Sequence, residues 1–395
     1  MYGIQRTSPD GSSRPDGLFM AIAHEWEVVH EADIEFDDVA ARCAQLIHVR
    51  RPGSSSADAA EASDSSKPSE LIIANVHLLF PHDEVSTRIR VREVHKLLSY
   101  LEGYKAALSR PVPSLICGDF NGEQNSRVME FLTKYGWECS FTRHAKAAQA
   151  QAASSSDGSD KGDLAAADGN EADGSGAGTT TPRWVSHYTH EQQAVGVDYI
   201  WVLNPSRRRL QVPDWTDFVF SEMAQQLSRV GFSAASDAWT YFYSLADHTP
   251  TEAAQIAYLQ AESESVAAAA ASNVPLDAAR FRRALGKLDF ERGDALGTLT
   301  EAEVMMVIDS CDIDGDGCVD GSEWRERFAS ALRRLKDEAL VADAADAAAD
   351  LEVEDAAFTP RCLEKGAWPD ASEWDLSDHG VLTSRFARRG SSPSS

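Results

Sequence analysis

The sequence lacks the features of membrane, secreted and zinc-ribbon proteins. It has no uninterrupted apolar run near the roughly 20 residues of a transmembrane helix. The first residues, MYGIQRTSPDG, lack the apolar centre of a secretory signal peptide. The six cysteines include no Cys-x-x-Cys pair, which argues against a zinc ribbon or a disulfide framework. These absences predict an intracellular, cytoplasmic protein with reduced thiols and no membrane span.

Basic residues are also scarce. The chain has 37 Lys and Arg against 63 Asp and Glu, which gives a formal net charge of −26. This balance argues against tight non-specific binding to nucleic acid, although it does not exclude a local basic groove. The length of 395 residues allows two domains, and a hydrophobic fraction of 43% is typical of a globular protein.

Short apolar runs and amphipathic segments alternate over the first half of the chain. The apolar runs predict strands within 16–50, at 71–80 and at 114–117. The helix predicted over 88–108 has one apolar face, made by Val91, Val94, Leu98 and Leu101. Strands separated by amphipathic helices indicate a layered α/β or α+β domain.

Several segments depart from this pattern. Residues 53–70 and 145–181 are rich in Ala, Ser, Gly and Asp, so we expect two disordered insertions. Residues 249–349 read as helical, and SDHGVLTSRF reads as a last strand before a disordered tail, 389–395.

The helical region contains the stretch DIDGDGCVDGSE, residues 312–323. Its residues match the twelve positions of an EF-hand loop, with side-chain ligands Asp312, Asp314, Asp316, Asp320 and Glu323 and a main-chain carbonyl ligand at Cys318. Gly317 occupies the sixth position, where the loop turns sharply. This all-oxygen set predicts one Ca²⁺ site.

EF-hands usually occur in pairs, and residues 272–288 resemble the exit half of a second hand. Leu276 stands where the residue that pairs the two loops belongs. Arg280 stands where the bidentate Glu belongs, and the upstream loop is Ala-rich. We therefore expect the first hand of an EF-hand pair within 249–349 to be degenerate and empty.

Four apolar segments end in polar residues: Asn75-Val76-His77, Gly118-Asp119-Phe120-Asn121, Val197-Asp198-Tyr199-Ile200 and Ser377-Asp378-His379. Together they resemble the endonuclease/exonuclease/phosphatase superfamily, and the NVHLLFPHD and GVDYIWVLNP runs resemble its calcium-binding, EF-hand-containing plant and algal members. The resemblance implies an α+β fold, a four-layer α/β/β/α sandwich over 1–240 plus 370–388. The helical EF-hand domain would be inserted before the last strand.

The resemblance also implies a function and a site. The chain would be a metal-dependent phosphodiesterase or nuclease that uses Mg²⁺ or Mn²⁺. Asp119 would orient or deprotonate the attacking water, and Asn121 would hold the phosphate and that water. His379 would stabilise the phosphoryl oxygens with Asp198 behind it, as an orienter–His pair does elsewhere. His77 would lie near the phosphate and Asp378 near the metal.

Other polar groups have simpler interpretations. Asp247-His248 also spells Asp-His, but the helix start that follows it argues against a catalytic role. His187 and His190 have too few neighbouring ligands for a metal site, so surface or loop positions are favoured. The basic run at Arg88, Arg90, Arg92 and Lys96 favours a solvated helix edge over a phosphate contact.

One expected residue is missing from the sequence. The superfamily's principal Mg²⁺ ligand is a Glu that belongs before the Arg14-Pro15-Asp16-Gly17 segment, and the first Glu here is Glu25. We expect an incomplete N-terminus in preference to a lost ligand. The alternative function is a catalytically inactive, Ca²⁺-responsive interaction or scaffold protein. Nucleic acids, phosphoinositides and other phosphodiesters all stay open as substrates.

Overall fold

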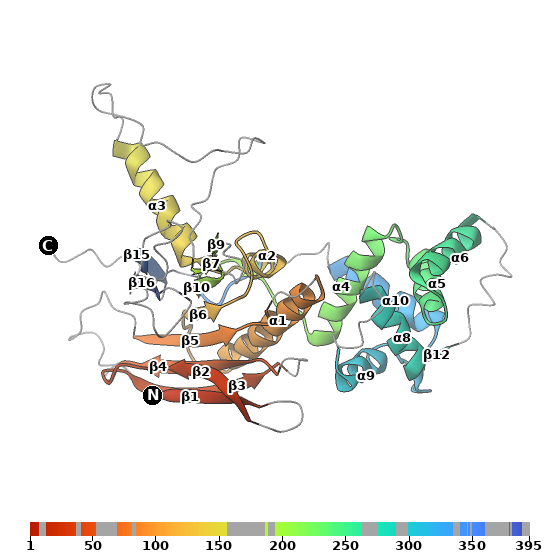
Figure 1. Ribbon diagram of the computed structural model, residues 1–395, viewed down its shortest axis with the longest axis horizontal. Helices are drawn as coiled ribbons and strands as arrows, with labels where there is room; N and C mark the ends of the chain where they lie inside the picture. The colour runs from red at the N-terminus through yellow and green to blue at the C-terminus, as the bar shows by residue number, and fades with distance from the viewer. Residues whose placement is uncertain are drawn as a thin grey trace.

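Figure 1 shows the computed structural model of the chain. It describes residues 1–7, 13–36, 41–52, 69–80, 84–155, 186–188, 194–262, 275–289, 299–334, 340–345, 347, 350–359, 379 and 381–388. None of the helices in these ranges combines the length and apolar character that a bilayer crossing needs.

A six-stranded mixed sheet with strand order β3-β4-β5-β6-β10-β7 forms the centre of the first region. Its strands are β3 (Glu27–Glu35), β4 (Cys43–Arg50), β5 (Glu70–His77), β6 (Ser114–Asp119), β7 (Glu138–Cys139) and β10 (Asp198–Leu203). The β5–β6 pair is parallel, and the other neighbours are antiparallel. The fold is therefore mixed α and β around a central mixed sheet.

Helices α1 (Glu84–Ala106) and α2 (Arg127–Lys134) belong to the core on one face of this sheet. Alternation along β5 buries Ile72, Ala74 and Val76 in that core. The four apolar residues predicted to share one face of the first helix are all buried, which confirms that prediction: Val91, Val94, Leu98 and Leu101.

Two hairpins pack on the opposite face of the sheet. The first joins β1 (Tyr2–Thr7) to β2 (Ser13–Met20), and Met20 packs against Ile47 and Val49 of β4. The second joins β15 (Leu351–Thr359) to β16 (Val381–Arg388), and Leu351 packs against Leu115 and Val202. Strand β16 confirms the predicted last strand. The complete four-layer sandwich stays a prediction.

Helix α3 (Ser140–Ser155) corrects the expected start of the second insertion. Residues 145–155 were expected to lack regular structure, but they form the second half of this helix. Their Ala- and Gln-rich composition explains the difference, because Ala has the highest intrinsic helix propensity. Residues 156–181 of that insertion, 53–68 of the first and the tail 389–395 lie outside the described residues.

The second region is helical (Figure 1). It comprises α4 (Trp215–Arg229), α5 (Ala235–Leu245), α6 (Pro250–Glu262), α8 (Ala278–Asp289), α9 (Glu301–Asp309) and α10 (Gly321–Arg334). Helices α4 and α5 both pack against α8 and α10. The helical region therefore begins at Trp215, earlier than residue 249, where the sequence placed its start.

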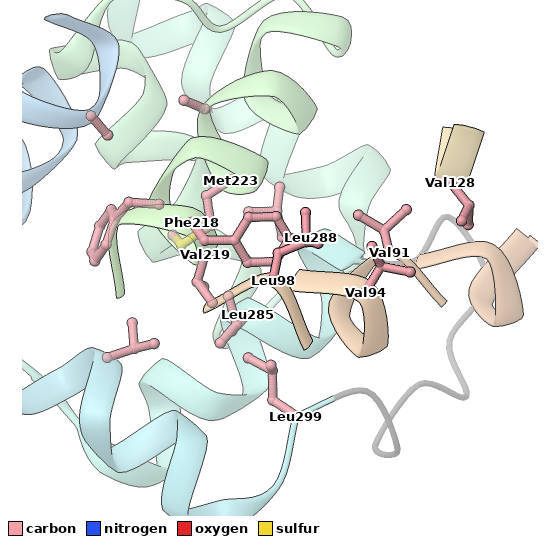
Figure 2. Packing of buried hydrophobic residues seen from close by; sticks show 14 of the residues in the cluster. Val91, Val94, Leu98, Val128, Phe218, Val219, Met223, Leu285, Leu288 and Leu299 are labelled. Carbon is pink, nitrogen blue, oxygen red and sulfur yellow. The ribbon is translucent and has the colours of Figure 1, made fainter. Parts of the chain in front are cut away.

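The two regions share one hydrophobic core (Figure 2). Val91, Val94 and Leu98 of α1 belong to the same buried cluster as Phe218 of α4 and Leu285 of α8. The apolar face of α1 thus belongs to the core of both regions.

Polar contacts accompany this shared core, and they overturn the solvated-edge prediction for the basic run of α1. Arg90 and Arg92 are only 3% and 5% exposed. The Arg92 guanidinium lies 3.3 Å from the Glu222 carboxylate, and Lys96 Nζ lies 2.6 Å from Glu303 Oε1. The prediction was wrong because helices of the second region cover this edge of α1. We call these contacts, with those of His95 described below, the seam.

Candidate functional site

Three neighbouring strands bring their polar ends into one row. His77 lies opposite Asp119 in the parallel β5–β6 pair, and Asp119 lies opposite Asp198 in the antiparallel β6–β10 pair. Directly opposed residues point to the same face of a sheet, so the three side chains meet. We call these three residues, together with His379, the rim.

His379 reaches the rim from a distant segment of the chain. It forms an isolated antiparallel bridge with His187 of β8 (His187–Tyr188). Its Nδ1 lies 2.8 Å from Asp198 Oδ2, within hydrogen-bond distance. If Nδ1 carries the proton and donates to that carboxylate, Nε2 is directed toward Asp119 Oδ2, which is 3.9 Å away.

The Asp119 carboxylate lies between two imidazoles. His77 Nε2 is 3.6 Å from Asp119 Oδ2, the same oxygen that His379 faces. The Asp119 side chain is only 13% exposed. Burial first, and the neighbouring Asp198 charge second, raise the pKa of Asp119 to about 7, against the opposing effects of the Asn121 amide and His379. The rim therefore favours a proton or a cation at this carboxylate.

The chain reaches this arrangement through an unusual backbone after β6. Gly118 has a φ of +130°, and a Cβ there would lie 2.0 Å from the Val76 carbonyl oxygen. Only glycine fits this position. Asn121 has a φ of +47°, an uncommon conformation for a residue with a side chain. Its backbone N–H donates to Asp119 Oδ1 at 2.7 Å and orients that carboxylate.

The amide nitrogen of the Asn121 side chain already has a partner. Its Nδ2 donates to the Leu78 carbonyl at 2.9 Å, and the residue is 6% exposed. The amide nitrogen thus braces the turn after β5, and the predicted contact with phosphate stays a prediction for Oδ1. Asp378 lies outside the described residues, so its place near a metal also stays a prediction.

Residues 186–187 contribute to the rim in a way that the sequence did not reveal. The His187 ring stacks on His379, with centroids 4.4 Å apart and an interplanar angle of 16°. Ser186 Oγ accepts the backbone N–H groups of Val197 and Asp198 at 2.9 and 3.1 Å. His187, for which a surface or loop position was favoured over a metal site, is half-buried in the hairpin that leads to Asp198. His190 lies outside the described residues.

The second Asp-His pair is confirmed as a helix start. The Thr249 amide and hydroxyl both donate to Glu252 Oε2 at 2.9 Å, and α6 begins at Pro250. Asp247 pairs with Arg280, whose Nη2 lies 2.5 Å from Asp247 Oδ2. These contacts give Asp247 a structural partner away from the rim.

Residues 312–323, which we call the loop, connect α9 to α10. Ligand atoms of Asp312, Asp314 and Glu323 lie within 4.8 Å of one another. Among the residues that the structure describes, this is the one cluster of three or more such ligands. Gly315 and Gly317 have φ values of +76° and +79°, which allow the chain to turn around the cluster. Hard carboxylate oxygens of this kind suit Ca²⁺.

A short antiparallel strand pair joins the loop to the segment that directly precedes α8. Leu276 of β12 (Leu276–Asp277) lies opposite Val319 of β13 (Cys318–Val319). This is the pairing predicted for Leu276. Thr300 caps α9 in a reciprocal box with Glu303. The strand pair thus holds the loop against the segment before α8, and the capping box fixes the start of α9.

Comparisons with known proteins give limited guidance. No family model matches the chain. It is similar to an uncharacterized calcium-binding protein of Arabidopsis thaliana, with 29% identity over 401 residues, 98% of this chain and 68% of that protein.

Several solved structures are similar to part of the chain. The human Nocturnin catalytic domain with bound sulfate has 16% identity and a TM-score of 0.33, over 53% of this chain and 62% of that domain. ANGEL2, a 2′,3′-cyclic phosphatase, has 16% identity and a TM-score of 0.32, over 51% of this chain and 62% of that one. The chain spans less than two thirds of either structure. Because both TM-scores are low, the rim and the loop must carry any functional assignment.

Proposed function

We propose that the chain is a metal-dependent phosphoric ester hydrolase of the endonuclease/exonuclease/phosphatase type. The observation that carries this proposal is the position of the Asp119 carboxylate between His77 and His379, with His379 paired to Asp198. Hydrolysis of a phosphate ester needs a base for water and donors for the phosphoryl oxygens. The rim supplies both kinds of group on one side of the sheet.

Each rim residue has a role that follows from its contacts. Asp119 orients or deprotonates the attacking water, because its raised pKa suits a general base near neutral pH. Asp198 holds the His379 ring through Nδ1, so that Nε2 of the doubly protonated imidazolium can donate to a phosphoryl oxygen. His77 contacts the phosphate from β5.

A divalent metal completes the proposed chemistry. Mg²⁺ or Mn²⁺ at the rim would neutralise charge on the phosphoryl group. Asp119 would attract the cation, because its carboxylate is buried beside Asp198. Asp378 would be a further ligand.

Turnover of a generic phosphodiester tests this proposal. With Mg²⁺ and bis(p-nitrophenyl) phosphate, we expect Asp119→Asn to lower kcat by at least about a hundredfold, because it removes the base. Asp237→Asn, on α5 in the helical region, is the matched control and should keep activity. A panel of RNA, DNA, phosphoinositide and cyclic phosphate would then define the substrate. Activity that is absent, or indifferent to Asp119, contradicts the proposal.

We further propose that the loop is an EF-hand that binds one Ca²⁺. The predicted ligands Asp312, Asp314 and Glu323 lie together, and the pairing of Leu276 with Val319 supports a two-hand arrangement. Arg280 takes the place of a bidentate Glu in the first hand and pairs with Asp247, which supports an empty hand. The printed name of the Arabidopsis relative, a calcium-binding protein, agrees with this proposal.

Isothermal titration calorimetry can count the bound ions. We expect one Ca²⁺ per chain, and loss of binding in Asp312→Ala. Asp309→Ala changes an exposed carboxylate at the end of α9 and should bind like the wild type. Binding of two ions, or of none, would contradict the one-site proposal.

The alternative function is a catalytically inactive, Ca²⁺-responsive scaffold. One observation favours it: among the described residues, three metal ligands gather at the loop and not at the rim. The same assay separates the two proposals. Ca²⁺ binding without turnover that depends on Asp119 would support the scaffold.

A further inference from the structure

A cavity of about 830 Å³ lies on the face of the sheet opposite the rim. Its walls come from α2, β7, α3 and β10, which lie close together in Figure 1. Tyr199 and Trp201 line it, and they alternate along β10 with Asp198, which points to the other face. Its volume falls within the range of about 300–1,000 Å³ that is common for small-molecule sites.

The floor of the cavity is apolar and aromatic. Met129 and Trp137 line it together with Tyr199 and Trp201, and all four residues are less than 10% exposed. Such a floor suits an apolar part of a ligand.

The wall residues reverse the charge balance of the whole chain. Carboxylates outnumber cations 63 to 37 in the sequence, but the cavity has four cationic side chains and two carboxylates. The cations are Lys134, Arg143, Lys146 and Arg207. Two of these cations pair with Glu138, because Arg143 lies 3.2 Å and Arg207 3.5 Å from its carboxylate. With four cations and two carboxylates, the formal net charge of the wall is 4 − 2 = +2. Such a wall favours an anion.

We propose that this cavity is a second ligand site, which binds a small organic anion with an apolar ring. The chemistry is that of a nucleoside monophosphate, with a ring against the aromatic floor and a phosphate at the cationic wall. The proposal does not depend on the phosphoesterase assignment, because it uses none of the rim residues. It assigns a binding role to the face of the sheet opposite the rim.

Calorimetric titration of the full chain with adenosine 5′-monophosphate, in EDTA to prevent turnover, tests the site. We expect saturable binding of adenosine 5′-monophosphate. Binding should be weaker for adenosine, which has the ring without the phosphate, and for inorganic phosphate, which has no ring. Lys146→Glu should weaken binding by about tenfold, because a wall charge is reversed. Arg333→Glu makes the same charge change on α10 and should have no effect.

Two further variants localise the bound nucleotide. Trp201→Phe keeps an aromatic ring but makes the apolar floor smaller, so binding should weaken while the circular dichroism spectrum is kept. Asp119→Asn should bind like the wild type. Binding that is lost in Asp119→Asn but kept in Lys146→Glu would place the nucleotide at the rim and overturn the inference. The absence of saturable binding up to about 10 mM would overturn it as well.

Discussion

The rim and the loop both gather carboxylates, but the chain brings them together over different distances. The loop takes its ligands from twelve consecutive residues, 312–323. The rim joins the ends of β5, β6 and β10 to His379, and the Asp198–His379 contact spans 181 residues of sequence. Local spacing therefore determines the loop, whereas strand pairing determines the rim.

Burial is the second difference between the two sites. Asp119 is largely removed from water, and its pKa is raised to about 7. In the loop, Asp314 and Asp316 are exposed and Asp312 and Asp320 are half-buried, whereas Glu323 is buried. These carboxylates accept backbone amides such as Gly315 N–H on Asp312 Oδ1 at 2.7 Å. Water and amides can stabilise charge in the loop, but in the rim the charge has a cost. The same residue type thus suits acid–base chemistry in one place and cation binding in the other.

The largest expected effect concerns the cost of charge at the rim. A pKa raised from 3.8 to about 7 means that folding favours protonated Asp119, so stability declines as pH rises through this interval. Above pH 7 the cost is about 4 kcal/mol. Asp119→Asn should therefore be more stable than the wild type at pH 8 in EDTA. Its gain in stability over the wild type should be smaller at pH 5. Urea unfolding at both pH values measures this difference.

Asp237→Asn is the control for that experiment and should show no pH-dependent gain. If Asp119→Asn is only as stable as the wild type at pH 8, or less stable, then charge at the rim has no cost. The rim and the loop would then not differ in this respect.

The seam offers a second test, because it decides whether the two regions unfold together. His95 of α1 stacks on Phe218, and its Nε2 lies 2.9 Å from the Pro213 carbonyl oxygen. Burial lowers the pKa of His95 from 6.5 to about 4. Its neutral form is favoured in the fold, so stability present above pH 6.5 should fall by about 3 kcal/mol as pH drops to 4.

His95→Gln keeps an N–H donor and removes the titration, so its unfolding free energy should depend less on pH between 6.5 and 4. His24→Gln changes a fully exposed imidazole and is the control. Separate acid transitions for the sheet and the helices would show two independent units.

Calcium should stabilise the loop by mass action. At a free Ca²⁺ concentration a hundredfold above Kd, the expected gain is about 2.7 kcal/mol. Glu323→Gln should lose most of this gain while keeping the acceptor for the Ile313 amide, which now donates to Glu323 Oε1 at 2.8 Å. Thermal unfolding with Ca²⁺ or EDTA measures the shift, and Glu326→Gln on the exposed side of α10 is the control. An equal shift in Glu323→Gln would exclude the loop as the site.

The smallest expected effect is the ion pair between Lys96 and Glu303. A double-mutant cycle with Lys96→Met and Glu303→Gln should give a coupling energy of about 1 kcal/mol, because both side chains are mostly buried. The more exposed pair of Arg280 and Asp247 is the comparison cycle and should couple less. Equal couplings would mean that burial at the seam does not strengthen the pair.

Sequence patterns were informative where contacts are local. The helix that buries Val91 and Leu98 and the cap at Thr300 both follow from residues near one another in the chain. Positions that depend on distant partners were harder to predict. The burial of Arg92 requires Glu222 of α4, and the stacking of His187 requires a residue almost 200 positions away. Charge pattern alone cannot reveal such partners.

The core that runs from α1 into α8 limits how the protein can be divided for study. A fragment restricted to the strands and α1–α3 would expose the side chain of Leu98, beside which Leu285 and Leu288 of α8 lie in Figure 2. Such a fragment would tend to aggregate during expression. Recombinant work should therefore retain the helices, even when only hydrolysis is of interest.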